Sequence, residues 1–176
     1  RFLNRVWRLA DTWLERLAPS PAYTASPDDL EGAVRELYKK SHQTIRKVTL
    51  DIDERFHFNT AISAVMELVN TMYGIDADSK LPHAAAVMRF AMESVTLLLA
   101  PMVPHFAEEI WQAMGHRQSI LQSQWPGFRE DALTKDEVEI VIQVNGKLRS
   151  KFNASAEAPD EDLKQSALAD EKVVKF

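Results

Sequence analysis

Residues 97–111 read LLLAPMVPHFAEEIW, two apolar helical segments joined by a corner that contains two prolines. A proline removes a helical hydrogen bond and restricts the residue before it, so Pro101 and Pro104 end one helix and begin another. The run that ends at Leu99 is apolar on almost every side. This pattern predicts a helix whose end is buried at the centre of a helical bundle.

Apolar residues also recur at spacings of three and four in the preceding sequence, which is the period of an amphipathic helix. Proline-rich and polar stretches separate these segments, with cap candidates at Ser26 or Asp28 and at Asn59 or Thr60. Because such stripes can bury their apolar faces only against one another, we expect a mainly α antiparallel bundle. The predicted helices cover residues 1–17, 30–55, 60–74, 82–99 and 105–115.

The sequence changes character at residues 137–152, EVEIVIQVNGKLRSKF, where apolar and polar residues alternate around an Asn-Gly pair. Alternation around Asn-Gly predicts a β-hairpin. Pro159 and the acids after it predict a short helix, and Val173 and Val174 a further strand. We therefore expect two domains, a helical bundle over residues 1–130 and a truncated small α+β unit over residues 131–176.

The composition is that of an ordinary globular protein, with 45% hydrophobic and 27% charged residues among 176. A net charge of −5 argues against a strongly basic nucleic-acid-binding protein, so any cationic surface must be local. The chain has no cysteine, which excludes disulfides and thiolate metal sites. It begins at Arg1, inside an amphipathic pattern, and we interpret it as a piece of a longer chain.

We predict no catalytic residue and no metal site, because phosphate-binding glycine motifs and nucleophile motifs are absent from the sequence. Glu54 and His57 form half of a di-iron helix motif, but no second Glu-x-x-His pair accompanies them. His105 and Glu109 lie four residues apart without a third ligand, so a surface pair is the simpler interpretation.

Two groups of basic residues are candidates for RNA contact. The first lies on the polar face of the second predicted helix, where a solvated helix face is the alternative interpretation. The second group occupies every other position along the return strand of the hairpin. This alternation predicts that its side chains share one face of the strand, at a spacing close to that of RNA phosphates. The alternative for this row is a charged strand edge that resists aggregation. The candidates are Lys39, Lys40, Arg46 and Lys47 in the helix and Lys147, Arg149 and Lys151 in the strand.

The four tryptophans are possible platforms for base stacking. Trp7, Trp13 and Trp111 lie on apolar stripes, so we expect them in the core. Trp125 lies in a loop and is the one for which we expect exposure.

Five stretches resemble the C-terminal part of bacterial leucyl-tRNA synthetases in order and spacing: RFLNRVWRL, FNTAISAVMELVN, LLLAPMVPHFAEEIW, QSQWP and DEVEIVIQVNGKLR. The resemblance covers nearly the whole chain. The proline corner is shared with the valyl, isoleucyl and methionyl enzymes, whereas FNTAISAVMELVN and QVNGKLR favour the leucyl family.

The resemblance implies a bundle of the class I anticodon-binding type, followed by the start of a small C-terminal domain. It also implies tRNA(Leu) as the partner, together with upstream catalytic and editing domains of the same chain that use ATP and Mg²⁺. We expect a cytoplasmic monomer with no membrane partner, and we expect the fragment itself to be catalytically inactive. The alternatives are a non-enzymatic helical scaffold, the equivalent bundle of a related synthetase, or, with less support, a cofactor-holding bundle.

Overall fold

A computed structural model describes residues 1–54, 56–133, 137–144, 147–155, 163–164 and 167–168. The chain divides into two compact units, Arg1–Leu133 and Thr134–Phe176. In the described part of the chain, none of the helices combines the length and the apolar character that a membrane crossing requires.

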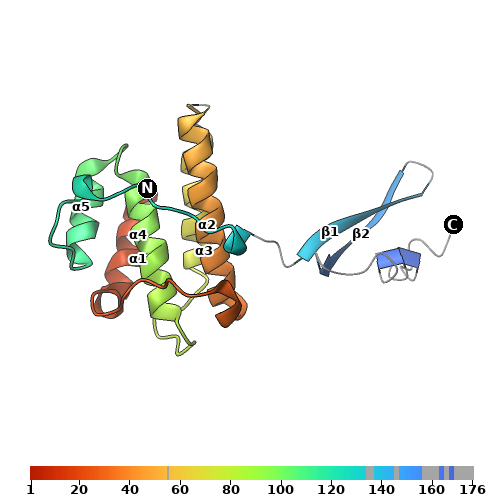
Figure 1. Cartoon of the computed structure of the whole chain (residues 1–176), viewed down its shortest axis with the longest axis horizontal. Helices are drawn as coiled ribbons and strands as arrows, with labels where there is room; N and C mark the ends of the chain where they lie inside the picture. Colours follow the sequence, from red (N-terminus) through yellow and green to blue (C-terminus); the bar gives the residue numbers. More distant parts are fainter. Residues whose placement is uncertain (55, 134–136, 145–146, 156–162, 165–166, 169–176) are drawn as a thin grey trace. The chain divides into compact units, whose positions relative to one another are not determined.

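The first unit is a bundle of five α-helices, which confirms the predicted fold class (Figure 1). Each helix lies within about three residues of its predicted bounds, because the stripes and the proline corner define the segments. The helices are α1 (Phe2–Leu17), α2 (Gly32–Asp53), α3 (Phe58–Met72), α4 (Ala84–Leu99) and α5 (Pro104–Ala113).

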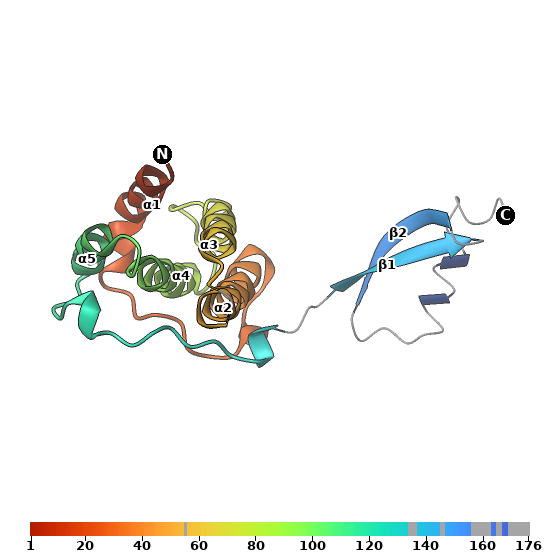
Figure 2. The same cartoon turned by 90° about the horizontal axis from the view of Figure 1, so that it is seen from above.

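Helix α4 is the central helix of the bundle, as its all-round apolar end predicts. Seen from above, α1, α2, α3 and α5 surround it (Figure 2), and α4 contacts each of them. Val95, Leu98 and Leu99 are buried, and so are Ser94 and Thr96, whose hydroxyls donate to backbone carbonyls one turn earlier. This pairing lets polar side chains lie in the core without unsatisfied groups.

Several large side chains of the helices are partly exposed, among them Trp7, which the sequence predicts in the core. Trp7 is 41% exposed, Met66 37% and Tyr73 43%, whereas Trp13 and Trp111 are buried as predicted. The exposed three lie at the margins of their stripes, where a large side chain covers the bundle edge without entering it. Tyr73 also turns its hydroxyl outward, donating to the Arg5 carbonyl at 2.7 Å.

Two helix starts differ from their predicted caps. Ser26 caps a short 3₁₀ turn, η1 (Pro27–Asp29), and its hydroxyl accepts from the Asp28 amide at 3.2 Å. Helix α2 begins later, at Gly32, whose φ of +52° favours glycine. Helix α3 begins after His57, with no side-chain cap hydrogen bond, so the prediction of an Asn59 or Thr60 cap is wrong.

After α5 the chain runs back across the bundle through two more 3₁₀ turns, η2 (Ile120–Gln122) and η3 (Asp131–Leu133). Ile120 and Ala132 are buried and hold this return segment on the helices. Along one side of the bundle it lies beside the loop that joins α1 to α2 (Figure 2), and Arg129 hydrogen-bonds to that loop.

The second unit contains the predicted hairpin, an antiparallel pair of β1 (Glu137–Val144) and β2 (Lys147–Ser155). Residues 163–164 and 167–168 are helical. The predicted Asn-Gly turn, the helix start at Pro159 and the strand at Val173 and Val174 lie outside the described residues.

Candidate nucleic-acid interface

The basic residues predicted on the polar face of α2 do not form one open surface. Lys39 is only 6% exposed, so its predicted place on the solvated face is wrong. Arg46 and Lys47, about two turns further along α2, are exposed. A side chain as buried as that of Lys39 has little surface to offer a phosphate.

Two of the remaining α2 cations are engaged in ion pairs. Lys40 Nζ lies 2.7 Å from a Glu67 carboxylate oxygen of α3, and Lys47 Nζ lies 3.0 Å from Asp51 one turn along. Hydrogen bonding and charge from Lys40 lower the pKa of Glu67. The Lys40–Glu67 pair is partly exposed and contributes little stability, whereas the Asp51 carboxylate is buried. Both lysines remain at the surface.

Helix α1 carries a cationic face that was not among the predicted RNA contacts. Arg1, Arg5 and Arg8 are exposed and stand at i, i+4 and i+7, which places them on one side of the helix. Arg5 is held in place, because its guanidinium donates to Asn70 Oδ1 at 2.8 Å and lies 5.1 Å from the Tyr73 ring centroid. The sequence signal for this face is the spacing of four and three residues between the arginines.

The hairpin register interrupts the alternation that the prediction for its basic row assumed. Ile142 pairs with Ser150, whereas the next residue, Gln143, pairs with Leu148. Arg149 therefore has no opposite residue, and β2 contains a bulge at this point. Because an extra residue offsets the period of two, the premise that alternation alone aligns Lys147, Arg149 and Lys151 is wrong. Their RNA contact stays a prediction.

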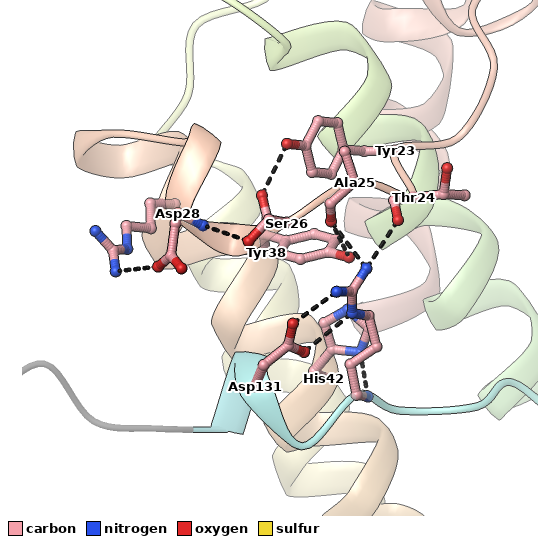
Figure 3. Close-up of polar contacts among 10 residues, drawn as sticks. Tyr23, Thr24, Ala25, Ser26, Asp28, Tyr38, His42 and Asp131 are labelled. Carbon is pink, nitrogen blue, oxygen red and sulfur yellow. Dashed lines mark hydrogen bonds and ion pairs between the residues drawn. The ribbon is translucent and has the colours of Figure 1, made fainter.

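Arg129, just before η3, is the centre of a polar network whose partners include Thr24, Ala25, His42 and Asp131, labelled in Figure 3. Its guanidinium forms two bonds to the Asp131 carboxylate, at 3.0 and 2.6 Å. It also donates to the carbonyls of Thr24 at 2.8 Å and Ala25 at 3.0 Å. Arg129 thus ties the end of the bundle to the loop between α1 and α2, and its hydrogen bonds first, and then its charge, lower the pKa of Asp131.

His42 joins the same network from inside α2 (Figure 3). It is 2% exposed, and its Nδ1 accepts a hydrogen bond from the Arg129 amide at 3.2 Å. The imidazole packs against the rings of Tyr38 and Phe90, with centroids at 4.5 and 4.7 Å, and those two rings also contact each other at 5.3 Å. Burial first, and then the Arg129 charge, lower the His42 pKa from 6.5 to about 4. A neutral ring suits this position, because Nδ1 must accept.

Acidification is expected to destabilise the bundle through His42. Folding lowers the pKa of His42, because the folded protein favours the neutral imidazole. The free energy of unfolding therefore keeps its full value above about pH 6.5 and decreases as the pH falls towards 4. The shift corresponds to about 3 kcal/mol at pH 4. We expect His42→Asn, whose side-chain oxygen can accept from the Arg129 amide, to remove this part of the pH dependence.

The measurement is urea unfolding of parent and His42→Asn between pH 7.5 and 4. The free energies of unfolding should converge as pH falls, because only the parent protein must protonate a buried ring. Contributions that the two proteins share cancel in the difference. Parallel pH profiles would show that His42 is not held neutral by the fold.

The residues considered for metal binding do not assemble a site. Within residues 1–54, 56–133 and the described parts of the second unit, no group of three or more His, Asp or Glu side chains is placed to hold a metal ion. Glu54 and His57 are both exposed at the end of α2, and His105 and Glu109 are exposed on α5.

Comparison with protein-family models gives a match to the anticodon-binding domain of tRNA ligase over residues 34–165. Curated relatives named leucine–tRNA ligase include one from Desulfatibacillum aliphaticivorans, 56% identical over all 176 residues, and one from Geobacter sp. strain M21, 49% identical over 173. The chain spans only 20% and 21% of their lengths, respectively.

Among solved structures, the chain is similar to a LeuRS of Agrobacterium radiobacter K84, crystallised in a ternary complex with tRNA and LeuAMS. The TM-score is 0.85 at 33% sequence identity. The match covers 99% of this chain and 22% of that one. Fold and sequence thus agree over nearly all of the 176 residues.

Proposed function

This chain belongs to the anticodon-binding domain family of tRNA ligases, and from that membership we propose that it binds tRNA(Leu) as part of a leucine–tRNA ligase. The observation that carries the proposal is the 56% identity to a leucine–tRNA ligase over the whole chain. The matched length includes the helices and the hairpin alike. A scaffold unrelated to tRNA is not favoured, because the family model describes a tRNA ligase domain.

The chemistry of leucine transfer belongs, in this proposal, to the part of the ligase outside these 176 residues. That part would use ATP and Mg²⁺ to activate leucine and would carry the editing activity. The chain described here contributes binding and orientation of tRNA. We propose that the whole ligase is a cytoplasmic monomer.

Cations at three places, exposed on α1 and α2, support RNA binding by a protein that is acidic overall. Arginines line one face of α1, Arg46 and Lys47 lie on α2, and three basic residues occupy β2. Lys and Arg side chains gain affinity for RNA by releasing counterions from phosphates. A few such contacts orient tRNA without requiring a basic surface throughout. The β2 residues are Lys147, Arg149 and Lys151.

A gel-shift measurement tests the assignment. The full-length ligase, and this chain alone, should bind tRNA(Leu) more tightly than a tRNA for another amino acid. The full-length ligase should also charge tRNA(Leu) with leucine. Charging of a tRNA for valine, isoleucine or methionine instead would contradict the leucyl assignment, and absence of tRNA binding would contradict the proposal as a whole.

The hairpin cations are expected to contribute salt-dependent affinity. Replacing Lys147, Arg149 and Lys151 together by Gln should weaken tRNA binding by the full-length ligase. The slope of log K against log salt should flatten by about 0.7–0.9 per lost phosphate contact. Leucine activation, measured by pyrophosphate exchange without tRNA, should not change.

Lys80→Gln is the control for that triple variant, because Lys80 is an exposed lysine in the loop before α4. It should leave affinity and slope at the parent values. If the triple variant also keeps both, the row is a charged strand edge that resists aggregation. Arg8→Gln, measured in the same way, tests the cationic face of α1.

A further inference from the structure

Trp125 lies on the segment between η2 and η3, where the chain crosses from α4 to α2. The Trp125 indole N–H donates to Thr49 Oγ1 at 2.8 Å, which fixes the ring against α2. Trp125 is nevertheless 39% exposed. A large aromatic side chain that is oriented by a hydrogen bond and still open to solvent is typical of contact surfaces.

Trp125 lines two hollows in the protein surface. One hollow is lined by Thr49, Ile52, Asp53 and Trp125. The other extends from Trp125 over the end of α4, where Leu97, Pro101 and Leu121 contribute to its wall. Leu121 is 77% exposed. We call these residues together the Trp125 surface: Thr49, Ile52, Asp53, Leu97, Pro101, Leu121 and Trp125.

The charge of the Trp125 surface favours a polypeptide over RNA as its occupant. Asp53 is the one charged residue among those that line the two hollows. RNA-binding surfaces require cations that neutralise the phosphates, and a carboxylate such as that of Asp53 repels phosphates. Leucine, proline and tryptophan side chains instead match an apolar protein segment, and exposed apolar patches rimmed by polar groups mark such contacts.

The likeness to leucine–tRNA ligases indicates where that segment comes from. This chain spans about a fifth of the length of the relatives it matches, so four-fifths of a comparable ligase lies outside it. We propose that the Trp125 surface is the docking site for an apolar segment of the same ligase polypeptide, outside these 176 residues. The proposal rests on the assignment of the chain to a leucine–tRNA ligase. Docking there would hold the tRNA-binding bundle at a constant orientation to the catalytic part.

Hydroxyl-radical footprinting of the full-length ligase, read residue by residue by mass spectrometry, tests the proposal. Leu81 is the internal reference, because it is the same residue type, 49% exposed, and lies before α4, at the opposite end from Leu97. Leu121 is 77% exposed and Leu81 49%, so Leu121 should react faster than Leu81 if nothing covers the Trp125 surface. If the Trp125 surface is docked, Leu121 should react several-fold more slowly than Leu81, and Trp125 should also be protected.

Two footprints would overturn the proposal. If Leu121 reacts faster than Leu81 with or without tRNA, the Trp125 surface is open to solvent in the whole enzyme. If Leu121 becomes protected only when tRNA(Leu) is added, the surface binds RNA. Leucine charging is measured on the same preparation, so an enzyme that charges tRNA(Leu) but leaves Leu121 reactive refutes docking and leaves the assignment of function intact.

A matched pair of substitutions gives a second measurement. Leu121→Asp should lower the melting temperature of the full-length ligase by several degrees, because a carboxylate would face an apolar partner. Leu81→Asp adds the same charge at an exposed leucine outside the Trp125 surface and should have little effect. Equal melting temperatures for the two variants would contradict docking at Leu121.

Discussion

Replacing Leu98 by Asp is expected to unfold the helical bundle. Leu98 is fully buried on α4, the helix that contacts the other four. A carboxylate there would lose its hydration without gaining a partner, and the apolar contacts of leucine would also be lost. Buried charges of this kind cost upwards of about 4–5 kcal/mol, which is most of the stability of an ordinary domain.

Helicity measured by circular dichroism during urea unfolding checks this result. Leu98→Asp should show no cooperative transition, or one shifted to much lower urea. Leu81→Asp is the control, because it introduces the same charge at a side chain that is already half exposed. A Leu98→Asp protein that unfolds at the same urea concentration as the control would refute the central placement of α4.

Replacing Arg89 by Met is expected to have the next largest effect. Arg89 is 7% exposed, and its guanidinium donates to the carbonyls of Leu17 at 2.8 Å and Met114 at 2.7 Å. These carbonyls belong to the ends of α1 and α5, where helical partners are missing. The guanidinium also contacts the Glu93 carboxylate and lies 2.9 Å from His116 Nε2.

Loss of Arg89 therefore leaves two buried carbonyls and a half-buried carboxylate without their strongest donor. Breaking a buried pair from one side costs about 3–5 kcal/mol. Lys40→Met is the control, since it breaks the exposed pair with Glu67 and should cost less than about 1 kcal/mol. Both values come from urea unfolding, and similar losses for the two variants would refute the role of Arg89.

A double variant separates the charge from the packing. Adding Glu93→Gln to Arg89→Met removes the carboxylate that is left without its partner, so part of the lost stability should return. No recovery would mean that the cost arises from the carbonyls of α1 and α5 and from packing, and not from the ion pair.

The candidate interface was predictable where a residue's position on its own helix or strand decides its exposure. Arg46 and Lys47 are on the surface as their helical spacing indicates, and the spacing of Arg5 and Arg8 would have added α1 to the candidates. Lys39 was misplaced, because the boundary of a buried face depends on the neighbouring helices. The bulge at Arg149 was not predictable either, because it depends on how β2 pairs with β1.

The sequence by itself determined the five helices, the proline corner, the central place of α4 and the existence of the hairpin, since hydrophobic period and turn residues act over a few positions. The tertiary structure alone decided which polar groups meet. Arg129 bonds to carbonyls that lie 104 and 105 residues earlier in the chain, and its amide reaches His42 across 87 residues. Local patterns carry no information about such pairs, because they form only when the packed helices bring distant segments together and exclude the water that would otherwise satisfy them.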